Sequence, residues 1–309
     1  MIEVAQLTKR YGPTTAVDGL TFTARPGTVT GFLGPNGAGK STTMRLIVGL
    51  ERPTSGTATV DGRRYSDLAA PLRSVGTMLD ARSLHPGRTA FRHLLAQART
   101  HGIPRARVHE VIAMTGLESV AKRRAGTFSL GMGQRLGIAN ALLGDPQTLI
   151  LDEPVNGLDP DGVLWVRTLV RDLASQGRTV LLSSHLMHEL ALCADRVVII
   201  GRGRLLADAS MQEIVDLSER AGTVRVRTSD PEALARALRA MGASAMPQGT
   251  GTLQVRGASV DQVGAAAAAC GATVLELTAE GVSLEEAYLQ LTAGSVQYRA
   301  ASPAAGGTR

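Results

Sequence analysis

The stretch Gly34-Pro35-Asn36-Gly37-Ala38-Gly39-Lys40-Ser41 has the pattern G-x-x-x-x-G-K-S. An apolar run, 29–33, precedes it, and a segment compatible with a helix, 41–50, follows it. Glycines at these positions let the backbone turn tightly and aim successive N–H groups at a phosphate chain, which the helix N-terminus also attracts. The pattern therefore predicts a phosphate-binding loop in preference to an ordinary glycine-rich turn.

Two residues of this loop carry the predicted chemistry. In loops of this kind the lysine, here Lys40, reaches the β- and γ-phosphates, and the hydroxyl of the following residue, here Ser41, holds Mg²⁺. The loop predicts a nucleoside triphosphate and nothing narrower, so the class of protein must come from the rest of the chain.

The composition limits the classes of protein that fit. With 309 residues, of which 44% are hydrophobic, the chain is long enough for two domains. No apolar run approaches the roughly 18 residues that a membrane helix needs, and the N-terminus lacks the features of a signal peptide. We therefore expect a cytoplasmic protein in which Cys193 and Cys270 are reduced, small buried residues.

The net charge of +6 raises the question of nucleic-acid binding. Proteins that bind single strands stack the bases on aromatic side chains, but aromatic residues make up only 3% of this chain and its arginines are scattered. We interpret the basic run 122–124 as a solvated face or a contact with a partner, and we expect no nucleic-acid partner.

An apolar segment, 148–151, ends in the acidic pair Asp152-Glu153. At the end of a buried strand, the first carboxylate is suited to hold Mg²⁺ and the second to polarise a water molecule. A second apolar segment, 179–184, ends in His185. Because α/β sheets bind ligands at the carboxyl ends of parallel strands, we favour a functional role for this histidine over a structural one.

Two further residues are ambiguous by themselves. Ser129 precedes a helix-like segment, so it fits either an ordinary helix N-cap or a second anion site. Tyr11 lies at a turn and fits either a strand end or an aromatic ring that stacks on adenine.

The remaining pattern predicts how the chain is organised. Residues 1–27 alternate as antiparallel strands do, and helical spacing over 89–117 indicates an inserted helical unit. Beyond a boundary expected near 221–222, alternating strands and helices, the last over 284–291, predict a small α+β module over 222–292 that resembles a ferredoxin-like sandwich. The composition of 293–309 predicts a disordered tail.

These motifs, in this order, resemble the ATP-binding subunits of ABC-type transporters over residues 1–220. The resemblance implies an α/β fold, a P-loop NTPase cassette with a RecA-like core, an antiparallel β subdomain and a helical subdomain. The chain is similar in particular to the ATPases of bacterial exporters that confer resistance to drugs, antibiotics or bacteriocins. In those exporters the membrane subunit is a separate chain, and residues 222–292 resemble their appended C-terminal domain.

The resemblance also implies roles for single residues. Tyr11 would stack on adenine, Asp152 would bind the metal, Glu153 would be the general base, and His185 would contact the γ-phosphate. Asp159 would touch the opposite subunit. The cradle for the phosphates and Mg²⁺ would consist of Gly34, Pro35, Asn36, Gly37, Ala38, Gly39, Lys40, Ser41 and Thr42, with Lys40 neutralising charge in the transition state.

The segment that follows Phe128 resembles the family's signature motif. Ser129 and Gly131 would close over the ATP of a second copy, so the resemblance implies a head-to-tail dimer around two Mg-ATP molecules. Such a dimer would power a separately encoded permease from the cytoplasmic face of the membrane.

Two departures from the family pattern bear on these roles. The signature usually reads Leu-Ser-Gly-Gly-Gln, but Leu130 stands at the first glycine position, where its bulk is expected to loosen or slow closure. Asp80 stands where a glutamine usually links Mg²⁺ to the membrane subunit. A carboxylate is a good ligand for a hard cation but is shorter and charged, so we expect contact with Mg²⁺ through water and altered coupling.

Two other functions stay open at this point. A soluble ABC ATPase acting on ribosomes or DNA is disfavoured, because such members carry two cassettes or long inserted coiled coils. An ATP-binding regulator without turnover is disfavoured by Glu153 and His185, whereas Asp80 and Leu130 leave it open.

Overall fold

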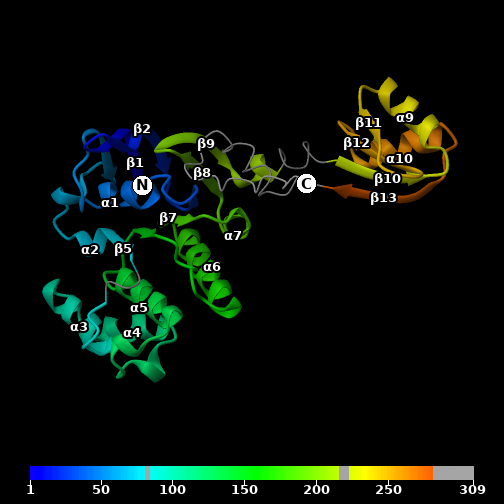
Figure 1. Ribbon diagram of the computed structural model, residues 1–309. Coiled ribbons are helices and arrows are strands. Elements are labelled where there is room, and N and C mark those ends of the chain that lie inside the picture. The colour runs from blue at the N-terminus through cyan, green and yellow to red at the C-terminus, as the bar shows by residue number, and fades with distance from the viewer. Residues whose placement is uncertain (81–83, 216–222, 281–309) are drawn as a thin grey trace, which may run out of the picture. The chain divides into compact units, whose positions relative to one another are not determined.

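The computed structural model describes residues 1–80, 84–215 and 223–280. Its contacts divide the chain into two compact units, one over Met1–Ala209 and one that begins at Ser210 (Figure 1). Several predictions fall outside the described residues. They are the boundary near 221–222, the helix predicted over 284–291 and the tail 293–309.

A three-stranded antiparallel sheet opens the first unit, as the alternation over residues 1–27 predicts. Its strands, in the order β2-β1-β4, are β1 (Ile2–Tyr11), β2 (Thr14–Ala24) and β4 (Ser55–Val60). The tight β1–β2 turn contains Gly12, whose φ of +56° is readily adopted by glycine.

A six-stranded sheet in the order β5-β6-β7-β3-β8-β9 forms the centre of this unit. The strands are β3 (Val29–Leu33), β5 (Val75–Met78), β6 (Thr148–Leu151), β7 (Thr179–Ser184), β8 (Arg196–Gly201) and β9 (Arg204–Ser210). The first five in this order run parallel. Their carboxyl ends therefore meet at one edge, which brings together loops that are far apart in the sequence.

Helices cover both faces of this sheet. On one face α1 (Lys40–Ile47) packs near the antiparallel sheet, and on the other α5 (Leu130–Leu142) and α6 (Pro160–Ser175) pack on the parallel strands. Two helices, α3 (Ala90–Thr100) and α4 (Arg105–Met114), pack on each other and on α5 (Figure 1). They form the helical subdomain that the spacing over 89–117 predicts. The short helices are η1 (Tyr65–Asp67), α2 (Pro71–Ser74), η2 (Glu118–Val120), η3 (Ala125–Thr127) and α7 (Met187–Ala191).

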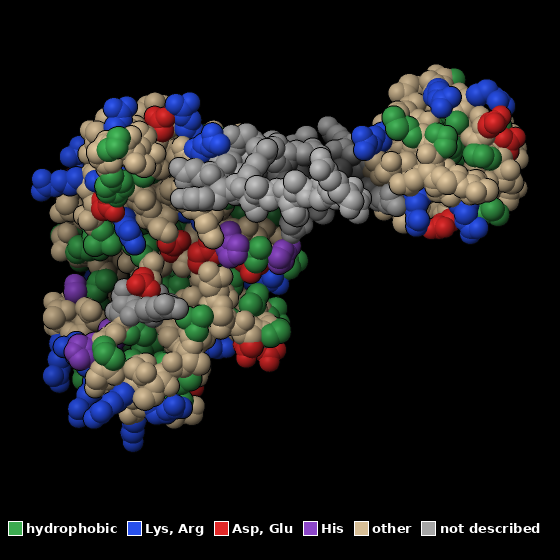
Figure 2. Space-filling view, in the orientation of Figure 1, with side chains coloured by type: hydrophobic (Ala, Val, Ile, Leu, Met, Phe, Trp, Pro, Cys, Tyr) green, Lys and Arg blue, Asp and Glu red, His purple; other side chains and the backbone are tan. Residues whose placement is uncertain are grey.

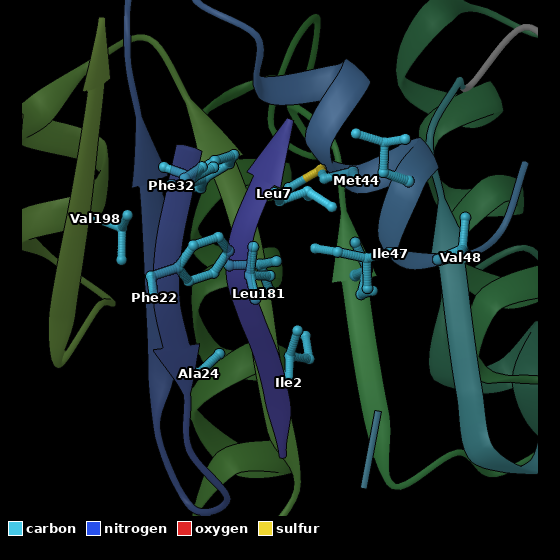
Figure 3. Close-up of a cluster of buried hydrophobic side chains, with 14 of the residues drawn as sticks. Ile2, Leu7, Phe22, Ala24, Phe32, Met44, Ile47, Val48, Leu181 and Val198 are labelled. Carbon is cyan, nitrogen blue, oxygen red and sulfur yellow. The ribbon is translucent and has the colours of Figure 1, made fainter. Parts of the chain in front are cut away.

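A hydrophobic core joins the two sheets of this unit through α1. The rings of Phe22 on β2 and Phe32 on β3 stack with centroids 5.3 Å apart. Figure 3 shows Leu7 of β1 and Met44 of α1 in the same core, and all four side chains are almost completely buried. This packing fixes the strand from which the phosphate-binding loop emerges.

Replacing Phe32 with alanine should destabilise the first unit by about 3–5 kcal/mol, because the buried ring would leave a cavity under the phosphate-binding loop. Urea unfolding can be followed through the single tryptophan, Trp165, which lies in this unit. The control is Leu50→Ala, at a side chain that is 69% exposed, which should change stability by less than about 0.5 kcal/mol. Equal effects of the two changes would contradict this account of the core.

The second unit has the strand and helix order βαββαβ. Its elements are β10 (Thr223–Thr228), α9 (Pro231–Ala240), β11 (Ser244–Pro247), β12 (Thr252–Arg256), α10 (Val260–Ala269) and β13 (Val274–Glu280). The antiparallel sheet has the order β11-β12-β10-β13, which is that of a ferredoxin-like sandwich, as predicted. The strand β11 was not expected from the sequence, because a single residue of this four-residue edge strand, Ala245, is buried and no alternation is visible.

The two cysteines differ in burial. Cys193 is buried as predicted, and this burial raises the pKa of its thiol to about 11. The same prediction was wrong for Cys270, which is only half-buried because it caps the C-terminal end of α10.

Figure 2 shows lysine and arginine side chains spread over the visible face with acidic ones among them. None of the described helices is long and apolar enough to span a membrane.

Candidate functional site

The loop between β3 and α1 is held close to neighbouring backbone. A Cβ atom at Gly34 would lie 2.6 Å from the carbonyl oxygen of Ile200, and one at Gly39 would lie 2.5 Å from that of Ala16. Gly39 also has a φ of +104°, which disfavours any other residue. No side chain in the described part of the chain caps α1, so the N–H groups of its first turn are available to an anion.

Lys40 places a buried ammonium group in this loop. Its Nζ donates to the carbonyl oxygen of Gly34 at 2.6 Å and lies 3.6 Å from Oε1 of Glu153. Burial lowers the pKa of Lys40 below the usual 10.5, although the charges of Glu153 and Asp152 oppose this shift. The charged form of Lys40 is therefore stabilised by the carboxylates beside it.

Glu153 is the point at which three segments converge. Its Oε2 is 2.7 Å from Nδ1 of His185 and accepts a hydrogen bond from Nδ2 of Asn156 at 3.3 Å. Because an ionised carboxylate only accepts, Nδ1 of His185 carries the hydrogen in this pair. The other ring nitrogen, Nε2, is then left for a ligand.

The backbone at Glu153 is in the left-handed region, with a φ of +49°. This conformation is unfavourable for a residue other than glycine and often marks a functional site. The hydroxyl of Ser183 accepts from the Glu153 N–H at 2.9 Å and donates to Oδ1 of Asp152 at 2.5 Å. One serine at the end of β7 therefore fixes both acidic residues that follow β6.

One cleft of about 340 Å³ lies at the phosphate-binding loop, and neither Asp152 nor Ser183 is part of its lining. Residues 35–42 form one side, and Glu153, Asn156 and His185 contribute from the ends of β6 and β7. The structure thus brings the predicted phosphate loop together with the predicted base and histidine. The arrangement can surround a phosphate chain with backbone N–H groups and one ammonium, beside a carboxylate paired with an imidazole.

Comparison with known proteins identifies the family. A model of the ABC transporter family matches residues 17–156. The chain is 42% identical over 211 residues to the bacitracin transport ATP-binding protein of Bacillus licheniformis, which covers 67% of this chain and 69% of that protein. The chain belongs to the ABC transporter family. It is an ATP-binding subunit of the ABC ATPase class, as the motifs predict.

Other matches agree with this assignment. The chain is 35% identical over 240 residues to the Nod factor export ATP-binding protein I of Burkholderia orbicola, covering 75% of this chain and 78% of that one. A solved ATP-binding subunit of an ABC transporter superposes with a TM-score of 0.64 at 28% identity, covering 70% of this chain and 92% of that one. The predicted cassette fold is thereby confirmed. A model described as a domain of unknown function matches residues 222–285.

Tyr11 of the ABC cassette lies outside the lining of the cleft but beside α1. Its hydroxyl is hydrogen-bonded to Glu51, the ammonium of Lys9 lies 4.9 Å from the ring centroid, and the residue is 45% exposed. Partial burial, the hydrogen bond to Glu51 and the charge of that carboxylate raise the pKa of Tyr11. The ring is thus held in place and partly open to solvent.

The residues of the signature motif cap a helix in the single chain. The hydroxyl of Ser129 accepts from the Met132 N–H at 3.2 Å, which is the N-cap alternative of the sequence analysis. A Cβ at Gly131 would lie 3.3 Å from the carbonyl oxygen of Gly157. Asp159 likewise caps α6, accepting from the Gly162 N–H at 2.8 Å. None of the three predicted residues lines the cleft of its own chain.

Asp80 and Asp152 follow two neighbouring strands, β5 and β6, which are paired in parallel. Asp80 is exposed, whereas Asp152 is half-buried and bonded to Ser183. The described residues contain no group of three or more His, Cys, Asp or Glu side chains suited to a metal ion. Oxygen ligands from Ser41 and Asp152 nevertheless fit Mg²⁺, which usually takes one or two protein ligands and completes its shell with water and phosphate.

Three contributing residues were missed from the sequence. Asn156 and Ser183 contact Glu153 directly, and Gln134 of α5 donates to the backbone beside it. The two serines that end an otherwise apolar strand, 183 and 184, were a usable signal. Asn156 gave none, although its contact with Glu153 lies within one turn, and Gln134 gave none because its contacts depend on how α5 packs.

The lowered pKa of Lys40 predicts how nucleotide affinity depends on pH. The charged ammonium attracts phosphate below this pKa, so ATP affinity should fall, by at most about tenfold per pH unit, as the pH rises through it. Equilibrium binding measured from about pH 8 upward would show the fall starting below the 10.5 of an exposed lysine.

Lys40→Arg is the control, because a guanidinium stays charged over this range. Its ATP affinity should be independent of pH, even if it is weaker throughout. An equally flat profile in the unaltered protein would contradict the lowered pKa.

Proposed function

We propose that this ABC ATPase hydrolyses ATP with Glu153 as the general base and thereby drives a separately encoded membrane exporter. One observation carries the proposal: the Glu153 carboxylate lies 3.6 Å from the ammonium of Lys40 and 2.7 Å from the ring of His185. A base must be within reach of a water that attacks the γ-phosphate, and this carboxylate faces the phosphate-binding loop.

The charges suggest how the site changes when ATP binds. In the protein alone, Lys40 is close to Glu153. Phosphate oxygens at the loop would compete for this ammonium, so the carboxylate would be freed to accept a proton from the attacking water. His185, whose Nδ1 is bonded to Glu153, would turn Nε2 toward the γ-phosphate. Lys40 would then neutralise the charge that develops in the transition state.

Mg²⁺ is the expected cofactor. Ser41 and Asp152 would hold it, and when bound it neutralises charge on the β- and γ-phosphates. The hydrogen bond from Ser183 fixes Oδ1 of Asp152, so the carboxylate is already oriented. Asp80, at the end of the neighbouring strand, would approach the metal through water.

We further propose that two copies assemble head to tail around two ATP molecules. Ser129, Gly131 and Asp159 lie outside the cleft of their own chain. Ser129 caps the N-terminus of α5, and a helix N-terminus favours an anion. A second copy would place these groups over the γ-phosphate and complete the site. Tyr11 would support the adenine from the opposite end.

The relatives suggest the kind of cargo. One is named for bacitracin transport and one for Nod factor export. By analogy we propose an exporter of drugs, antibiotics or peptides, in which this subunit lies at the cytoplasmic face of the membrane, bound to the permease. The permease, and not this chain, would contact the cargo.

Glu153→Gln tests the proposed base. The amide cannot accept the proton, so hydrolysis should fall by at least about 100-fold while ATP binding is retained. The unhydrolysed nucleotide should then hold two copies together, which light scattering in saturating ATP and Mg²⁺ would detect. Glu232→Gln, in the second unit at a side chain that is 89% exposed, should leave hydrolysis unchanged.

Each arm of this experiment can fail separately. Normal hydrolysis by Glu153→Gln would exclude this residue as the base. A variant that binds ATP without hydrolysing it but stays monomeric would contradict the head-to-tail dimer.

Asp80→Gln tests coupling to the permease. It restores the residue that is usual in the family, so it should change how strongly the membrane subunit stimulates hydrolysis more than it changes the basal rate. The measurement compares ATPase rates with and without the co-purified permease in lipid vesicles. An unchanged stimulation ratio would show that Asp80 has no part in coupling.

A further inference from the structure

We propose that Gln134, on the signature helix α5, is a positioning residue that holds Glu153 in its catalytic conformation. The inference rests on the proposed role of Glu153 as general base. It assigns to α5 a second task, within its own chain, besides the proposed contact with the nucleotide of a second copy.

The contacts of Gln134 converge on one turn. Its Nε2 donates to the carbonyl oxygen of Glu153 at 3.3 Å and to that of Asn156 at 3.1 Å. Both partners are carbonyls, which only accept, so the orientation of the amide is set by chemistry. Gln134 is 4% exposed, so water does not compete for these bonds.

This turn determines where the carboxylate of Glu153 lies. The Asn156 N–H donates to the Glu153 carbonyl oxygen at 3.2 Å and closes the turn. The side chain of Asn156 then donates to Oε2 of Glu153. Gln134 therefore holds the backbone of Glu153 and that of Asn156, whose side-chain amide orients the Glu153 carboxylate.

The turn needs such support because Glu153 adopts a φ of +49°. A left-handed backbone at a residue with a side chain persists only when its surroundings hold it there. Ser183 binds the N–H of Glu153 and Gln134 binds its carbonyl oxygen, so the peptide groups on both sides of the strained residue are fixed.

Packing alone does not account for an amide at position 134. Its Oε1 is buried and has no hydrogen-bond partner among the described residues, which is unfavourable for a polar atom. An apolar side chain of similar size would fill the space without this cost. The two bonds to the turn are the compensating gain.

The support should matter most after ATP has bound. In the protein alone, Lys40 and His185 also hold the Glu153 carboxylate. Lys40 is proposed to turn to the phosphates, which leaves His185, Asn156 and the backbone contacts to place the base. Loss of Gln134 should therefore lower the rate of the chemical step and leave nucleotide binding unchanged.

Gln134→Met removes the donor and keeps the length of the side chain. We expect kcat to fall by about 10- to 100-fold, since a small displacement of a catalytic group has effects of this size, with KM for ATP unchanged within about twofold. The control is Asn140→Leu, which removes an amide of α5 whose oxygen also lacks a partner among the described residues and which has no hydrogen bond to the turn. It should change neither parameter.

A second comparison uses the Glu153→Gln background. If Gln134 acts through the base, Gln134→Met should cause no further loss in the residual hydrolysis of that variant. The doubly substituted protein should still form the ATP-bound dimer. Gln134→Asn, which keeps the amide but is too short for both carbonyls, should lower kcat in the same way and serves if the methionine variant does not fold.

The outcomes separate this inference from the proposed function. Three results would overturn the role of Gln134 without affecting the proposed base. They are an unaltered kcat in both Gln134→Met and Gln134→Asn, a rise in KM as large as the fall in kcat, and a loss that adds to that of Glu153→Gln. Full hydrolysis by Glu153→Gln would overturn the proposed base and, with it, this role.

Discussion

The buried ammonium of Lys40 is the constraint on which the site depends. A buried cation needs a partner of opposite charge, and here the partner is Glu153, on a segment more than a hundred residues further along the chain. The two meet because the sheet order β6-β7-β3 sets the end of β6 two strands from the phosphate-binding loop, with the end of β7 between them. His185, from the end of β7, then bonds to the same carboxylate.

The ammonium of Lys40 lies close to acidic groups that favour its charged form. Burial lowers the pKa of Lys40, the carboxylates of Glu153 and Asp152 oppose that shift, and Glu153 in turn is bonded to His185. The phosphates of ATP would add negative charge beside Lys40. Its ammonium would then bind phosphate oxygens in place of the Glu153 carboxylate. In the proposed mechanism, the attraction of the phosphates for Lys40 would release the carboxylate of Glu153 to act as the base.

In the signature region, Leu130 at the start of α5 contacts the turn that follows Glu153. Leu130 lies over Gly157, where a Cβ atom would come within 2.2 Å of the leucine side chain. The turn that follows Glu153 is therefore in contact with the first residue of α5 as well as with Gln134. Any movement of α5 toward a second nucleotide would act on the turn that carries the base. This contact gives the departure at Leu130 a structural basis that a comparison of motifs does not supply.

The sequence by itself determined the phosphate-binding loop, the acidic pair, the strand-end histidine, the cassette fold and the ferredoxin-like module. These follow from local patterns: glycine and lysine spacing, apolar runs that end in charged residues, and alternation of strands and helices. Only the tertiary structure decided that Asn156, Ser183 and Gln134 hold Glu153, that Tyr11 is bonded to Glu51, and that β11 completes the second sheet. Apart from the local contact between Asn156 and Glu153, these contacts join residues from different elements. The sequence does not indicate which distant group a given amide or hydroxyl will contact.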